Sequence, residues 1–171
     1  MILTILGLLA AAAPQATPDP LAPARQGKVR CIAPNAAAKT CQSIIQYTLH
    51  DDGSFDAKVA GIVRREPSVV VIYRTSGAVE GELVCSTVRP YDLLHGDFYR
   101  GDQPLTGPLA EQVHDELMLR LQDIAGQKRC YTDRVEGGQL HGAVTLNGIA
   151  HPEMDQTAVW VSPDEGYALG E

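Results

Sequence analysis

Side chains that could bind or react with a ligand are most concentrated in residues 91–102. This segment has no regular helical or strand period, and irregular segments often carry binding residues. An imidazole beside a carboxylate could act as a base with its orienting partner, or both groups could hold a metal ion. The nearby guanidinium could hold an anion. The candidate ligand-binding residues are Tyr91, His95, Asp97, Tyr99 and Arg100.

The same segment also fits a purely structural role, in which its aromatic rings close one end of the core and its charges face water. No nucleophile is signalled beside His95, and the chain has no G-x-S-x-G, H-E-x-x-H, P-loop or G-x-G-x-x-G motif. The sequence therefore favours a protein that is not an enzyme, and we predict no catalytic residue, metal or cofactor. The alternative is a small hydrolase or metal-dependent enzyme that uses His95 and Asp97 of residues 91–102, with or without His141.

The four cysteines predict two disulfides, because an even number of cysteines in an exported chain is most often fully paired. The sequence alone leaves three pairings open. We favour Cys31 with Cys41, which closes a short loop, and Cys85 with Cys130, which lie on either side of a predicted helix. The C-x-x-C spacing of thiol oxidoreductases and the clustered cysteines of zinc sites are both absent from the sequence. A reactive thiol is the alternative if one pair does not form.

Export is predicted from residues 1–16. Residues 2–13 form an apolar run, and small residues and a proline follow it, as at a signal-peptide cleavage site. The run is shorter than the roughly 20 residues that a membrane-spanning helix needs, although no Lys or Arg precedes it. A membrane anchor or a buried helix is the alternative. We expect a periplasmic or secreted protein without stable membrane insertion after cleavage.

The composition is that of a folded globular protein, with 44% hydrophobic and 20% charged residues. The chain carries 14 basic and 21 acidic side chains, which gives a net charge of −7. An acidic chain without a basic stripe argues against nucleic acid and anionic membranes as main partners. The expected partner is a protein or a small-molecule ligand in the cell envelope.

The domain organisation follows from changes in composition along the chain. Residues 17–27 contain three prolines and predict a flexible spacer after the signal. Residues 28–163 then predict one globular domain, and residues 164–171 predict a solvated tail.

The clearest helical period lies in residues 106–124, where apolar residues recur every three or four positions. They form one stripe that must be buried against another element. The residues of this stripe are Leu109, Val113, Leu117, Leu121 and Ile124.

Strand-like alternation lies on both sides of this helix. Residues 51–53 predict a tight turn between two strands, with Tyr47 and Ala57 on their inward rows. Residues 69–72 are apolar on both faces and predict a covered central strand. Cys85 is expected on the inward row of its strand.

Together these patterns predict an α+β fold, in which a mostly antiparallel sheet of about six or seven strands carries one amphipathic helix on a face. The favoured function is an exported, non-enzymatic binding or envelope accessory module.

Overall fold

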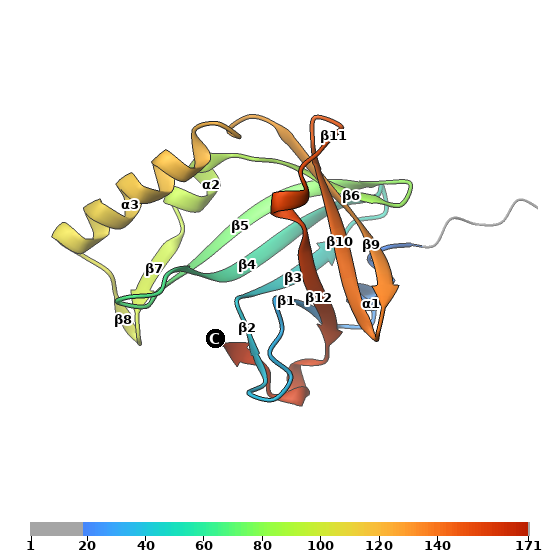
Figure 1. Cartoon of the computed structure of the whole chain (residues 1–171), viewed down its shortest axis with the longest axis horizontal. Coiled ribbons are helices and arrows are strands. Elements are labelled where there is room, and N and C mark those ends of the chain that lie inside the picture. The colour runs from blue at the N-terminus through green and yellow to red at the C-terminus, as the bar shows by residue number, and fades with distance from the viewer. Residues whose placement is uncertain (1–18, 171) are drawn as a thin grey trace, which may run out of the picture.

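Strand pairing dominates the fold, as the alternating sequence requires, but the sheet is closed rather than open (Figure 1). The computed structural model describes residues 19–170, so the predicted signal at residues 1–16 lies outside the described residues. Within residues 19–170, eight antiparallel strands follow one another in the order β4-β3-β1-β12-β10-β9-β6-β5, and β4 pairs with β5 to complete a barrel. The barrel strands are β1 (Val29–Ile32), β3 (Ser43–Leu49), β4 (Ser54–Arg64), β5 (Val69–Glu80), β6 (Leu83–Thr87), β9 (Lys128–Glu136), β10 (Gln139–Leu146) and β12 (Gln156–Val161).

The predicted α+β fold, an antiparallel sheet with one helix on a face, is therefore wrong. A closed barrel packs its inward face against itself, so no helix is needed to cover that face. Closure depends on pairings between segments far apart in the chain, such as Arg30 with Trp160 and Cys85 with Cys130. A period of two along each strand does not reveal these pairings.

Shorter elements decorate the barrel. The helices are α1 (Ala22–Arg25), α2 (Pro90–Leu94) and α3 (Pro108–Leu121), with single 3-10 turns η1 (Pro152–Met154) and η2 (Pro163–Glu165). The additional strands are β2 (Thr40–Cys41), β7 (Asp97–Arg100), β8 (Gln103–Pro104), β11 (Ile149–Ala150) and β13 (Ala168–Leu169).

The predicted helix is present as α3, but it covers only the part of β5 that extends beyond the barrel. Its apolar stripe buries Val113 and Leu117 against Val69 and Val71 of β5 and Phe98 of β7. This contact explains why residues 69–72 are apolar although they do not line the barrel interior. Figure 1 shows α3 lying to one side of the strands rather than across the barrel wall.

The two ends of the barrel are built differently. α1 directly precedes β1, whose first residue Val29 pairs with Val161 at the end of β12. α2 and α3 instead connect the end of β6 to the start of β9, where Thr87 pairs with Lys128. Because the strands are antiparallel, α1 and the α2–α3 segment lie at opposite ends of the barrel.

α1 closes its end of the barrel through Leu21, which is 0% exposed and belongs to the core cluster with Phe55 and Val144. The described part of the predicted spacer, residues 19–27, is thus part of the fold. The predicted solvated tail, residues 164–171, also contains a strand. This strand, β13, pairs in parallel with β2 beside the Cys31–Cys41 disulfide.

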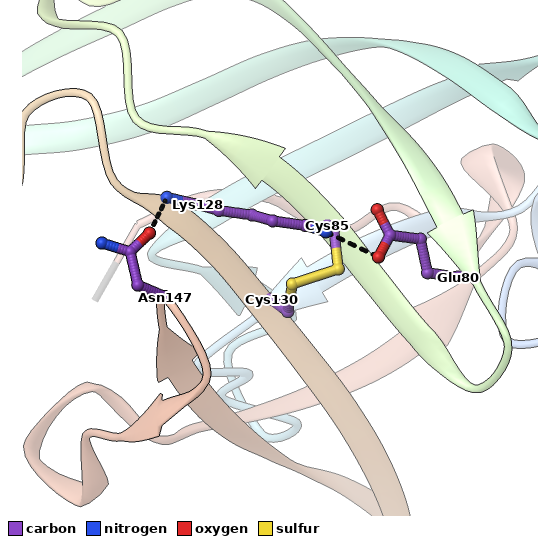
Figure 2. The surroundings of a disulfide bond; sticks show 5 residues. All are labelled: Glu80, Cys85, Lys128, Cys130 and Asn147. Carbon is purple, nitrogen blue, oxygen red and sulfur yellow. Dashed lines mark hydrogen bonds and ion pairs between the residues drawn. A yellow bond between two sulfur atoms is a disulfide. The ribbon is translucent and has the colours of Figure 1, made fainter.

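Both disulfides join the cysteines paired in the sequence analysis. Cys31 and Cys41 lie 5.4 Å apart between Cα atoms, and Cys85 and Cys130 lie 4.1 Å apart. The second bond connects directly opposed residues of β6 and β9 (Figure 2). The Lys128 side chain runs past this bond, and its Nζ lies 2.6 Å from a carboxylate oxygen of Glu80.

Cys85 does not lie on the inward row, as the sequence had suggested. A two-residue turn places Glu80 opposite Leu83, so Val79 and Val84 share the inward face and Cys85 faces outward. The prediction failed because the turn shifts the alternation by one residue between the two strands.

Candidate functional site

The barrel interior is the candidate site, because charged and phenolic side chains share it with apolar ones. On β9, the alternate residues Arg129, Tyr131 and Asp133 lie on one face. Tyr131 is directly opposite Val84 on the neighbouring strand β6, and Val84 faces inward, so this face of β9 also faces the interior. Arg30 on β1 and Tyr47 on β3 reach the same interior. Polar groups inside a small barrel must be paired or solvated.

Arg30 is 0% exposed, and its two terminal nitrogens are paired, whereas its Nε has no hydrogen-bond partner among the described residues. Its guanidinium donates two hydrogen bonds to Asp133, one of them 2.8 Å long from Nη2 to Oδ1, and it lies 4.2 Å from the centroid of the Tyr131 ring. Burial opposes the charge, but the hydrogen bond to Asp133 and the tyrosine neighbours outweigh it, so the pKa of Arg30 is raised. This pair neutralises one interior charge with another.

Three tyrosine hydroxyls lie near these charges. The hydroxyl oxygens of Tyr47 and Tyr131 are 3.0 Å apart and share one hydrogen bond. Burial raises the pKa of Tyr47 and of Tyr73, and it raises that of Tyr131 well above the ordinary value. All three hydroxyls therefore keep their protons at neutral pH and remain hydrogen-bond donors.

We expect these three tyrosines to ionise later than free tyrosine in an alkaline titration followed by tyrosinate absorbance. The unfolded hydroxyl has a pKa of about 10, and the folded pKa values lie above it. The contribution of these hydroxyls to the free energy of unfolding is therefore fully present below a pH of about 10, and it is lost as the pH rises through the folded pKa values. Replacing Tyr131 with Phe should remove part of the late-titrating signal, and an unchanged titration curve would contradict the assignment.

Arg129 differs from Arg30, because within residues 19–170 no hydrogen bond or ion pair holds its side chain. Burial lowers its pKa, with Tyr47, Tyr131 and Tyr73 close enough to oppose that effect and Arg30 adding to it. An arginine remains charged even so. Arg129 is only partly buried, and it is one of the residues that line a cavity.

This barrel cavity has a volume of about 320 Å³. Arg129, Tyr47, Tyr73 and Tyr131 supply its polar wall. Its apolar wall is formed by side chains from four strands: Ile32, Ile45, Phe55, Ala57, Val59 and Val84. A second hollow, which His50, Glu80 and Lys128 help to line, is more open. Small-molecule sites are typically concave, mostly apolar and about 300–1,000 Å³, with few polar groups.

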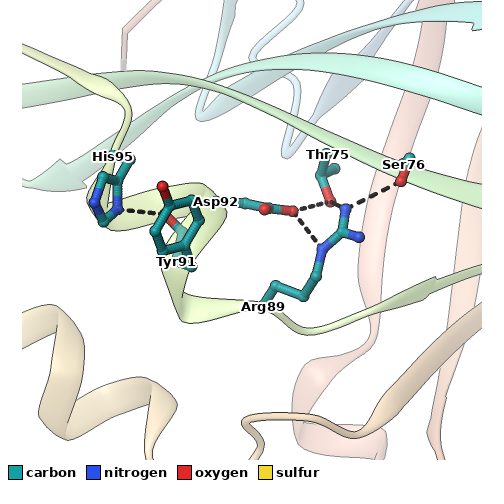
Figure 3. Close-up of polar contacts among 6 residues, drawn as sticks. All are labelled: Thr75, Ser76, Arg89, Tyr91, Asp92 and His95. Atoms are coloured by element: carbon teal, nitrogen blue, oxygen red, sulfur yellow. Dashed lines mark hydrogen bonds and ion pairs between the residues drawn. The ribbon is translucent and has the colours of Figure 1, made fainter.

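At the end of the barrel cavity next to α2 and α3, the lining residues are exposed or partly exposed, so we call this end the mouth. They are Arg89, Asp92, Leu93, Leu121, Ile124, Met154 and Gln156. Asp92 fastens α2 to β5, because it accepts a 2.9 Å hydrogen bond from the Thr75 hydroxyl and one of 2.8 Å from Nε of Arg89 (Figure 3). Arg89 also donates to the Ser76 hydroxyl at 3.0 Å. The rim of the mouth is thus held by specific polar contacts.

The candidate residues of segment 91–102 lie outside this cavity. Tyr91 is 68% exposed and stacks on His95 with ring centroids 3.8 Å apart, and His95 Nδ1 donates to the Tyr91 carbonyl oxygen at 3.0 Å (Figure 3). Asp97 and Arg100 are exposed on β7, and Tyr99 is partly buried there. The structure brings Tyr91 and His95 together but leaves His95 and Asp97 without a shared contact among its described hydrogen bonds.

His141, the distant histidine of the enzyme alternative, is exposed on β10, which does not pair with β7. Among the described residues, no group of three or more His, Cys, Asp or Glu side chains could hold a metal ion. In the same part of the chain, no helix is long and apolar enough to span a membrane.

Sequence reasoning missed the interior residues Arg30, Arg129 and Asp133. The available signal was the alternation on β9, where two charged residues share a row with Tyr131. Charged residues in alternate positions of a strand normally indicate its solvent-facing side. From the sequence alone, Arg129 and Asp133 would therefore be assigned to the outer face of the sheet.

Comparison of the chain with protein-family models, with curated proteins and with solved structures finds no match to any of them. The geometry of the barrel interior therefore carries the functional argument alone.

Proposed function

We propose that the protein is an exported binding module that holds a small, largely apolar molecule inside its barrel. The observation that carries this proposal is the barrel cavity of about 320 Å³, with an apolar wall and a mouth beside α2. For comparison, an apolar cavity of about 150 Å³ is enough to hold benzene. The barrel cavity has room for a molecule of about twice that size.

The scaffold suits this role, since a closed barrel with a cross-strand disulfide holds its wall residues in fixed positions. A preformed site binds more tightly because less conformational entropy is lost on binding. The two disulfides also favour an oxidising compartment, which agrees with a periplasmic or secreted location.

The test is a titration of the protein with 1-octanol, followed by backbone amide NMR. We expect saturable shifts at residues of the cavity wall, such as Val84 and Tyr131. Replacing Ala57 with Phe should weaken binding at least roughly tenfold, because the ring would occupy the space beside Tyr47 and Thr75.

The matched control is Lys58→Phe, which adds the same ring to an exposed position of the same strand. This variant should bind 1-octanol like the parent protein. The absence of saturable shifts in the parent protein, or equal binding by the Ala57 and Lys58 variants, would overturn the proposal.

A further inference from the structure

The barrel cavity contains one positive charge that the described residues do not neutralise. Arg30 and Asp133 form a pair and cancel each other. Arg129 lines the cavity, and no carboxylate of residues 19–170 forms an ion pair with it. A cation that is partly withdrawn from water and lacks a partner costs free energy to bury, so its presence calls for an explanation.

The one carboxylate among the described residues that line the cavity is Asp92, which is the candidate for an internal partner. Its Oδ2 oxygen accepts hydrogen bonds from both Thr75 and Arg89. Asp92 is therefore already paired with a cation of its own. Gln156, which also lines the mouth, is neutral and cannot balance the charge.

Hydrogen-bond donors without partners lie on the same wall. The Tyr73 hydroxyl makes no hydrogen bond with any described residue, and Tyr47 and Tyr131 share one bond between two hydroxyls, which leaves one of their protons available. A guanidinium that no carboxylate pairs with, beside hydroxyl groups that can still donate a proton, is complementary to an anion.

We infer that the ligand of the barrel cavity carries a single anionic head, such as a carboxylate, which Arg129 binds with help from the tyrosine hydroxyls, while an apolar body fills the rest of the space. This inference rests on the proposed function. A carboxylate matches the planar guanidinium through two parallel hydrogen bonds. One negative charge is sufficient, because Arg129 is the one interior cation left unbalanced among the described residues.

The test compares octanoate with 1-octanol, two probes of equal chain length that differ in the charge of the head group. Their affinities are measured by calorimetry near neutral pH for the parent protein and for Arg129→Met, which keeps a long side chain but removes the charge. The control is Arg134→Met, on the same strand but exposed at the outer surface.

The parent protein should bind octanoate about 10-fold to 100-fold more tightly than 1-octanol, as expected for hydrogen bonds to a charged group. Arg129→Met should lose this preference while keeping its affinity for 1-octanol, and Arg134→Met should keep both affinities. Arg129→Met should also melt no lower than the parent protein, because it removes an unpaired charge, whereas a purely structural arginine would lower the melting temperature.

The outcomes separate the two proposals. Equal binding of octanoate and 1-octanol by the parent protein, or an octanoate preference that survives in Arg129→Met, would overturn the anionic head group and leave the binding module standing. Failure of both probes to bind would overturn the proposed function itself.

Discussion

Replacing Asp133 with Ala should lower the free energy of unfolding by about 3–5 kcal/mol, because it leaves a buried charge without its partner. The charge is that of Arg30, which is 0% exposed and donates two hydrogen bonds to the Asp133 carboxylate. The ring of Tyr131 would remain beside the guanidinium, but a cation–π contact replaces only part of the loss.

Urea denaturation provides the measurement, with Glu80→Ala as the control. Glu80 pairs with Lys128, but both side chains are 48% exposed, so its loss should cost no more than about 1 kcal/mol. A second comparison, Arg30→Met with Asp133→Leu in one protein, should recover much of the lost stability. A cost for Asp133→Ala no larger than that for Glu80→Ala would show that the interior pair does not stabilise the barrel.

Removing the Cys85–Cys130 disulfide by replacing both cysteines with Ala should cost about 4 kcal/mol in the chain-entropy model. This bond spans 45 positions of sequence and encloses α2, β7, β8 and α3. Without it the unfolded chain is freer, and the folded barrel loses its covalent link between β6 and β9.

The matched control is the same double replacement at Cys31 and Cys41, whose separation is only 10 positions. The shorter loop should cost about 3 kcal/mol. Both variants are compared with the oxidised parent protein by denaturant unfolding. Equal stability of the parent protein and the Cys85–Cys130 variant would contradict the assigned role of that bond.

Local features of the fold could be predicted from the sequence because they depend on neighbouring residues. The turn at residues 51–53 joins β3 to β4, and Tyr47 and Ala57 face each other on the inward rows that their alternation indicates. The apolar stripe of α3 likewise buries Val113 and Leu117. Each of these signals lies within about ten residues of chain.

Closure of the sheet was beyond such reasoning, because it depends on pairings between distant strands. The alternation of β1 is the same whether its neighbour is β12 in a barrel or open solvent at a sheet edge. A helix with one apolar stripe could cover the face of an open sheet or pack only on the extension of β5. The second packing is the one that α3 adopts. The predicted α+β arrangement was the wrong choice between these packings.

The candidate site was missed for the same reason. Residues 91–102 contain many side chains able to form hydrogen bonds, but α2 and β7 hold most of them at the surface. Arg129 looks like an ordinary solvent-facing residue until its strand is known to form part of a closed wall. Composition can show which groups a chain possesses, but topology decides which groups lose contact with water.

The pairing of β1 with β12 also constrains the order in which the barrel can form. Residues 29–32 can form their strand pairing with β12 only after residues 158–161 have been synthesised. Contacts between segments so distant in sequence form slowly, because a long loop must first be closed. The emerging chain therefore stays open until nearly all of it is available, and a chain that ends before β12 would expose unpaired edges on β1 and β10.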